Sequence, residues 1–467
     1  MALYAKARKL ARHGRVRPSR AHINTLIAAV GSDITARARY LIRNNGYAAN
    51  AIESWAGNAV GDGIRPSSSI GDAGLKAAVQ RLWLAWTDES DADGLTDFYG
   101  QQRRAAREIF IAGEVFFRFR SRRPEDGLTV PLQVQMIPSE MLPLARNETL
   151  QNGNVIRQGI EFDRIGRRLA YHFLKRHPGD ITDPGLAGET GRVPASEIMH
   201  IIDPVDAGQL RGVSRFAPAI VKLFLLDQYD DAELDRKKVA AQYAVFITSP
   251  APMDTGKDDK KSAGEDREVD LEPGQIVPLE PGEEIHPSAP ADVGGSYEAF
   301  QYRTLLQIAA ALGVPYAHLS SDMLKANYSN SRMALLEYRR RVGAWQHSVM
   351  VYQMCRVVWR RWMDAAVLSG ALSIPEYESR RDECLACDWL PPRWEWVDPL
   401  KDAKAEIEQI NAGLKSRSQA IAERGYDAET VDAEIAADKA REQRLGLQFG
   451  ATPSQAPSAD PVIQTDQ

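Results

Sequence analysis

A stripe of apolar side chains between residues 330 and 370 predicts one very long helix. Its members recur at alternating spacings of three and four residues, which is helical periodicity: Leu335, Tyr338, Val342, Trp345, Val349, Tyr352, Cys355, Trp359 and Trp362. Asn and Ser favour loops and N-caps, so we expect the helix to begin near Asn330 or Ser331. No proline interrupts it before Gly370, and it would span about 39 residues, or about 58 Å. Few monomeric domains need so long a rod.

Five further segments have a helical pattern. They are residues 33–60, two stretches between 75 and 113, residues 218–243 and residues 297–312. Two acidic helical stretches follow between Lys401 and Leu445, after a Trp-rich loop. The glycines of GNAVGDGIRP resemble a dinucleotide-binding loop, but they follow a helix rather than a strand, so we interpret them as a turn.

Short alternating strands are predicted between the helical stretch that ends at residue 113 and the one that begins at residue 218. EVFFRFRSRR, LQVQMIPSEML, IRQGIEFDRIGRRLAYHFL and EIMHIIDP are separated by Gly and Pro, which indicates a mostly antiparallel β unit. Phe116, Phe117 and Phe119 are its expected core.

The helix at 218–243 has little apolar stripe beyond Leu226, so it is either solvated or packs sideways against copies of itself. It carries Glu233/Lys237 and Asp235/Lys238 at helical ion-pair spacing. A charged excursion rich in Pro and Gly follows and ends in the strand-like QIVPL.

The composition is that of an ordinary protein with real hydrophobic cores: 467 residues, 44% apolar, with a net charge of −5. No stretch is long and apolar enough for a membrane span, and no secretory signal is visible, so we expect synthesis in the cytoplasm and no membrane partner. The first twenty residues are wholly basic among their charged positions, which suits either a solvated tail or contact with nucleic acid or an acidic partner.

The three cysteines fit a reducing compartment. Cys384 and Cys387 form a CxxC, but a structural zinc needs four ligands and a redox pair needs a βα junction. We interpret the pair as partly buried thiols in a loop.

Signatures of enzymes are missing: the sequence has no Walker loop, HExxH or GxSxG motif. His200 and Asp203 suit core and turn positions better than acid–base catalysis. DESDADG partly resembles a calcium loop, but it lacks the closing Glu. We therefore predict no catalytic residues, no metal and no cofactor. The alternative is a metal-dependent DNA-processing enzyme that uses Glu89, Asp91 and Asp93. A third hypothesis is a scaffold that uses the long helix for coiled-coil assembly.

Several segments, in order, resemble the lambda-type family of tailed-bacteriophage portal proteins. They are RARYLIRNNGYAANAIESWAGNAVGDGI, GEVFFRF, RGVSRFAPAI, IAAALGVPYAHLSSDMLKANYSNSRMALLEYRR and WVDPLKDAKAEIEQINAGLKSRSQAIAERGYD. The resemblance spans roughly residues 30 to 445 and is weakest at both termini and in the charged excursion.

The resemblance implies an α+β, portal-like fold, mainly helical, with an antiparallel β wing and long stem and tunnel helices. The implied parts are a basic arm (1–30), a wing-like region (31–215), a stem helix (216–244), a clip-like excursion (245–295), a second stem helix (296–319), a tunnel loop (320–330), a tunnel helix with a crown-like region (331–445) and a disordered tail (446–467).

It also implies a function and partners. The chain would be a head–tail connector in the virion of a phage or prophage, assembled in the host bacterial cytoplasm as a ring of twelve copies at one capsid vertex. Double-stranded DNA would pass through it without sequence specificity during packaging and ejection. Terminase, the major capsid and scaffold proteins, and a head-completion or tail adaptor would bind it.

The implied tunnel loop is small and polar, which suits a surface along which DNA slides, because each tight phosphate contact would act as a brake. The candidate loop residues are Ser320, Ser321, Lys325, Asn327, Ser329 and Asn330. Lys325 is either a weak phosphate contact or a solvated lysine. Arg332, Arg339 and Arg340 face the channel or pair with a neighbouring subunit, and we expect such pairing for at least two of them.

Overall fold

The computed structural model describes residues 20–180, 182, 188–241, 245–248, 284–287, 296–324, 328–392, 394 and 399–447. Within these ranges the fold is α+β and mainly helical, and its strands form antiparallel sheets, as the sequence predicts. The basic arm up to residue 19 and the segment QIVPL lie outside the described residues.

The predicted helix at 33–60 is two helices, α2 (Ile23–Asn44) and α3 (Gly46–Ala59). They are separated at Asn45, whose side chain accepts a 3.0 Å hydrogen bond from the backbone of Ala48 and caps α3. This capping by Asn is the reason that the single helical pattern breaks. Strand β1 (Arg65–Ser68) follows the predicted glycine turn, and α4 (Ala73–Glu89) and α5 (Phe98–Ala112) are the two helices expected next.

Two antiparallel sheets make up the predicted β unit. One has the order β3 (Leu132–Ile137), β2 (Glu114–Ser121), β9 (Ile198–Ile202). The other has the order β4 (Glu148–Thr149), β5 (Val155–Arg157), β6 (Ile160–Phe162), β7 (Arg168–Leu174), β8 (Thr190–Pro194). Alternate residues of β2 serve two cores, because Phe117 and Phe119 join the main core and Phe116 joins a smaller core with Tyr171 and Phe173.

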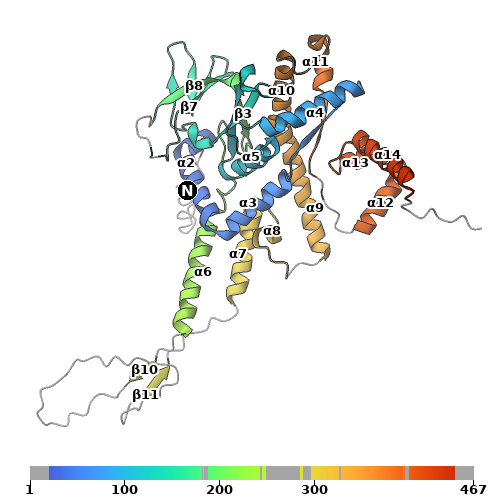
Figure 1. Ribbon diagram of the computed structural model, residues 1–467. Coiled ribbons are helices and arrows are strands. Elements are labelled where there is room, and N and C mark those ends of the chain that lie inside the picture. The colour runs from blue at the N-terminus through green and yellow to red at the C-terminus, as the bar shows by residue number, and fades with distance from the viewer. Residues whose placement is uncertain are drawn as a thin grey trace, which may run out of the picture.

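Below these layers, α6 (Ile220–Ala241) and α7 (Ser296–Leu312) project from the body side by side (Figure 1). The ion pairs expected on α6 are present, with Lys237–Glu233 at 4.0 Å and Lys238–Asp235 at 3.1 Å. At the far end of α6, β10 (Val245–Thr248) pairs with β11 (Glu284–Pro287).

The predicted long rod exists, with a π-helical segment inside it. It consists of α9 (Tyr328–Trp345), a π-helix (Gln346–Cys355) and α10 (Arg356–Leu368). Because a π-turn takes more residues than an α-turn, the buried face shifts. Tyr352 belongs to the apolar stripe of the sequence but is 64% exposed, whereas Met354, which is not part of that stripe, is fully buried.

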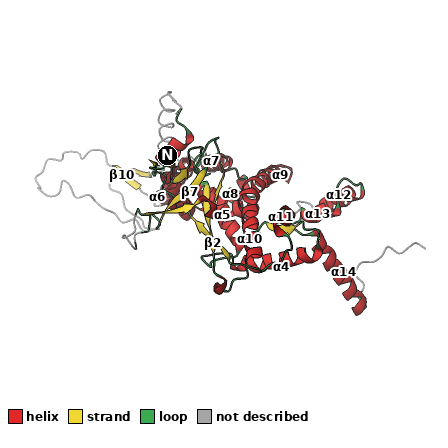
Figure 2. Cartoon of the chain, turned by 90° about the horizontal axis from the view of Figure 1, so that it is seen from above, coloured by secondary structure: helices red, strands yellow, loops and turns green. Residues whose placement is uncertain are grey.

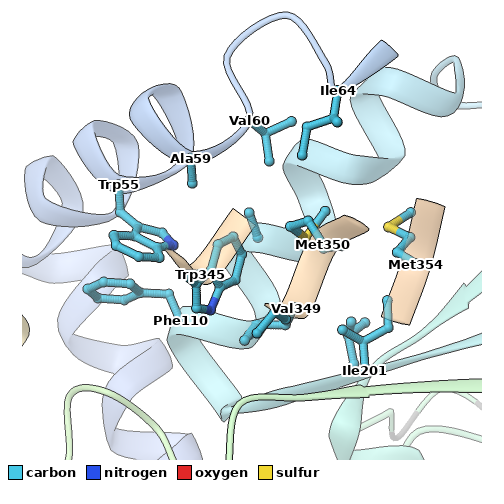
Figure 3. Close-up of a cluster of buried hydrophobic side chains, with 14 of the residues drawn as sticks. Trp55, Ala59, Val60, Ile64, Phe110, Ile201, Trp345, Val349, Met350 and Met354 are labelled. Carbon is cyan, nitrogen blue, oxygen red and sulfur yellow. The ribbon is translucent and has the colours of Figure 1, made fainter. Parts of the chain in front are cut away.

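This rod is the centre of the main core. Trp345, Val349, Met350 and Met354 face side chains from α3, α5 and β9 (Figure 3). Gln353 in the π-helix binds both backbone groups of Ile202 on β9, each at 2.9 Å. The π-helix thereby ties the rod to the sheet.

The region after Gly370 contains more structure than its predicted loop and two helices. It has α11 (Tyr377–Leu385), β12 (Cys387–Leu390), α12 (Pro399–Asn411), α13 (Arg417–Ala422) and α14 (Ala428–Leu445). Strand β12 pairs with β1, about 320 residues away in sequence, which no local pattern predicts. Helices α12–α14 lie on the side of the molecule away from the five-stranded sheet (Figures 1 and 2).

Candidate functional site

The predicted tunnel loop begins at a short helix that is fastened to α3. Helix α8 (Tyr316–Ser320) ends at Ser321, whose φ of 58° is left-handed. The side-chain amide of Asn50 on α3 donates to the carbonyls of His318 and Leu319 and to the hydroxyl of Ser321, each at 3.0 Å. The amide satisfies the terminal carbonyls of α8, so the start of the loop is held in place.

The next residues fold back on α8 and then expose apolar side chains. Asp322 accepts a 3.1 Å hydrogen bond from the Tyr316 hydroxyl, and its backbone NH donates to Ser320 at 3.1 Å. Met323 is 65% exposed and Leu324 is 95% exposed. The sequence suggested a small, polar loop, but these exposed side chains make part of its surface apolar.

Three of the expected loop residues lie in helices instead. Ser320 is the last residue of α8. Ser329 and Asn330 belong to the first turn of α9, because the helix begins at Tyr328 rather than near Asn330. The expectation that these three residues are in the loop is wrong. Lys325 and Asn327 lie outside the described residues.

The three arginines of α9 have different surroundings. Arg332 lies 3.3 Å from Asp402 of its own chain, at the start of α12. Arg339 lies over the ring of Trp394 at 5.1 Å, and burial lowers its pKa. Arg340 is exposed. Arg332 and Arg339 thus have contacts within their own chain, whereas the sequence led us to expect pairing with a neighbouring subunit.

The exposed start of α9 gives way to a firmly packed half. Tyr338 is 3% exposed and contacts Trp55 of α3 edge to face, with ring centroids 6.5 Å apart. His318 of α8 packs against Tyr338 at 5.1 Å, and burial lowers the pKa of this histidine. Upstream of Tyr338, Met333 and Leu336 are 72% and 48% exposed. The first turns of α9 and the residues Met323 and Leu324 thus expose apolar side chains close to a firmly packed base.

The acidic loop of the enzyme alternative is a structural turn. Asp91 is 4% exposed and accepts hydrogen bonds from the backbone of Asp93, Leu95 and Thr96. Glu89 accepts from both the backbone and the hydroxyl of Thr129. In the described part of the chain, no group of three or more His, Cys, Asp or Glu side chains could hold a metal ion.

The other candidate groups also have structural surroundings. His200 lies 3.0 Å from the carboxylate of Glu114, and both side chains are almost fully buried. Asp203 forms an ion pair with Arg215 at 2.9 Å. Cys384 and Cys387 are free thiols whose pKa values are raised by burial, but they lie in α11 and β12 rather than in a loop.

The comparison with protein families agrees with the resemblance in the sequence. The model described as phage portal protein, lambda family, matches residues 9–346. The chain belongs to this family. Its members are structural proteins of phage particles, not a known enzyme family. No described helix has the length and apolar character needed to cross a membrane.

Individual relatives are portal proteins as well. The probable portal protein of Halomonas phage phiHAP-1 is 26% identical over 429 residues, covering 88% of this chain and 80% of that protein. Portal protein B of Escherichia phage lambda is 25% identical over 459 residues, covering 88% and 84%. A chain from the neck of a native GTA particle, computed with C12 symmetry, covers 82% of this chain at 16% identity and a TM-score of 0.47, which by itself carries no conclusion.

Sequence reasoning missed Asn50, Met323 and Leu324. Asn50 acts on residues about 270 positions away, so no local spacing shows its role. The apolar pair Met323–Leu324 stands in the sequence among polar neighbours, and its two letters alone do not show that both side chains are exposed.

Proposed function

We propose that this chain forms a ring at one vertex of a phage capsid and that the ring is the channel for packaging and ejecting DNA. The observation that carries the proposal is the family match over residues 9–346, which includes α6, α7 and the exposed segment before and within α9. The ring contains twelve copies, as the resemblance to this family implies.

The proposal assigns a role to each part. Residues 31–215 are the wing, α6 and α7 are the stem, and residues 245–295 between them are the clip, which binds terminase and then the head-completion or tail adaptor. Residues 320–330 are the tunnel loop, and residues 331–445 form the tunnel helix and crown. The wing contacts the major capsid and scaffold proteins, and assembly takes place in the host bacterial cytoplasm.

The described geometry supports a moving contact with DNA at the tunnel loop. Asn50 holds the base of the loop, while Met323 and Leu324 are exposed and carry no charge. Apolar and neutral polar groups give no counterion-release contribution to DNA affinity, so DNA slides past without being held. Energy for packaging comes from the separate terminase.

A complementation experiment tests this function. A phage or prophage that lacks this chain should produce particles without DNA, and supplying the intact chain in trans should restore DNA-filled particles. A matched control is the chain truncated before α9, which should not restore filling. Particles that fill with DNA in the absence of the chain would contradict the proposal.

A further inference from the structure

A ladder of arginines lies on the face of the three-stranded sheet opposite the main core. Arg118 and Arg120 are in β2, and Arg122 follows it directly. Residues two apart in a strand point to the same face, so the three side chains share one face while Phe117 and Phe119 point into the main core. Burial, and then repulsion by Arg118 and Arg122, lower the pKa of Arg120. The ladder therefore concentrates positive charge.

Neutral partners hold two of these arginines in position. Arg120 donates through Nε to Oε1 of Gln135 at 2.9 Å, and Arg122 donates through Nε to Oε1 of Gln133 at 2.8 Å. An amide oxygen orients a guanidinium group without neutralising it, unlike a carboxylate. Arg118, by contrast, forms an ion pair with Glu197 at 2.9 Å.

The acidic loop between α4 and α5 orients these glutamines in turn. Gln135 donates to the Asp93 carboxylate at 3.2 Å, and Gln133 donates to the backbone carbonyl of Glu89 at 2.8 Å. Because Asp91 fixes the turn through its hydrogen bonds to the backbone, the loop has a rigid shape. The motif that resembles a calcium loop thus positions the arginine ladder.

The ladder lies between two adjoining pockets that share Arg118 and Arg120. One has a volume of about 480 Å³ and is also lined by Arg361 of α10. The other has a volume of about 580 Å³ and is also lined by Lys175 and Arg176 beyond the end of β7. Together they form a groove across the ladder, which we call the arginine groove.

Positive charge exceeds negative charge in this groove. Its acidic members are Glu197, Asp364 and Asp180, of which the first two form ion pairs with Arg118 and Arg381. Arg120 and Arg361 line the groove, and Arg122 follows Ser121, which lines it as well. None of the three arginines has an ion pair with a carboxylate of the described residues, so their guanidinium groups remain available to an anion.

We propose that the arginine groove binds the phosphate backbone of DNA, at a site separate from the tunnel loop. A row of guanidinium groups recognises a row of phosphates without reading base sequence. An acidic protein segment would also need apolar anchors to bind stably, yet the apolar side chains lining the groove are buried or half-buried, apart from Leu368. The inference goes beyond the channel proposal and does not depend on ring formation.

Titration of a short fluorescent DNA duplex with the full-length chain, at a series of salt concentrations, tests the groove. The variant R120Q/R122Q removes two ladder charges. The control R380Q/R441Q removes two arginines elsewhere, which pair with Glu383 and Asp438, and changes the net charge equally. At about 0.15 M salt we expect the ladder variant to bind roughly 30-fold more weakly, with the slope of log affinity against log salt reduced by about 1.8. The control should bind like the wild type.

Equal affinities of the ladder and control variants for DNA would overturn the proposal. The proposal would also be overturned if the ladder variant lost binding to polyglutamate but still bound DNA, since that result identifies an acidic protein as the occupant. Photo-crosslinking of the wild-type chain to DNA gives a second test that needs no variant, and it should label residues 118–123. Electron microscopy of the same variants separates the two proposals. If the variants still form rings but the groove does not bind DNA, the groove proposal fails and the channel proposal stands.

Discussion

Glu114, at the start of β2, is the centre of a buried charged cluster. It is 1% exposed and accepts hydrogen bonds from Arg211 at 2.8 Å, from Ser139 at 2.7 Å and from the backbone of Gly212 at 2.7 Å. Arg211 and His200 hold the pKa of this carboxyl far below its ordinary value despite burial. The remaining donors of Arg211 bind backbone carbonyls, so the whole cluster is satisfied.

Replacing Glu114 with Ala should destabilise the chain by about 3–5 kcal/mol, because Arg211 would remain buried without its counter-ion. Urea unfolding of the unassembled chain, followed by tryptophan fluorescence, measures this loss. The control Asp432→Ala breaks an exposed pair with Arg417 and should cost no more than about 1 kcal/mol. Equal stability of the two variants would show that the cluster contributes nothing.

The π-helical segment is the element whose sequence pattern misled us most. The spacing of apolar residues predicts the rod from the loop to Gly370, and the rod is present. However, spacing assumes an α-helix throughout, so the stripe includes the exposed Tyr352 and leaves out the buried Met354. Nothing in the sequence of residues 346–355 indicates the wider π-helical turn. The structure shows that this turn brings Gln353 to strand β9, where it binds the backbone of Ile202.

Met354→Ala should therefore cost about 2–5 kcal/mol, because it empties part of a packed core. Tyr352→Ala, its neighbour on the exposed side, should change stability by no more than about 0.5 kcal/mol. Thermal unfolding of both variants compares the two positions directly. The opposite order would mean that the α-helical pattern describes the rod better than the π-helix does.

At the tunnel loop, Lys325→Ala should reduce packaging or retention of DNA while ring assembly stays normal. The loop's one cation would otherwise repeat around the ring and supply a weak phosphate contact to passing DNA. DNA content per particle is the measurement, and Lys439→Ala on α14 is the control. Wild-type yields of filled particles would reject a required role for Lys325.

At the scale of the whole molecule, α6 and α7 expose apolar side chains that one chain leaves uncovered. Phe224 is 47% exposed, Leu234 is 54% exposed and Phe300 is 50% exposed. The helices hold each other through Tyr297, which stacks on Tyr229 at 5.8 Å and donates to Asp230. The sequence left open whether α6 is solvated or packs against α6 of another copy of the chain. These exposed apolar groups favour packing between copies.

Leu234→Asp should leave the folded chain intact and reduce ring assembly at least tenfold, because it places a charge where a neighbouring α6 or α7 would pack. Ile165→Asp is the control, since Ile165 is 87% exposed in a distant β-turn. Native mass spectrometry measures the fractions of single chains and of assembled rings for both variants. Normal assembly of Leu234→Asp would place the subunit contacts elsewhere.

The sequence predicted the helices, the β unit and the family because their signals are local or occur as ordered motifs. It did not predict β12 and its pairing with β1, the fastening of α8 by Asn50, or the contact of Arg332 with Asp402. Each of these joins residues far apart in the chain, and local periodicity carries no information about such pairs. The roles of the loop residues remain predictions.

Electron microscopy of the purified full-length chain, with mass determination, tests the ring most directly. We predict end-on views of rings, with the mass of about twelve copies and a central hole wide enough for duplex DNA. Compact monomers or dimers in every condition, including added scaffold and capsid proteins, would contradict the proposal that this chain is the DNA channel of a capsid.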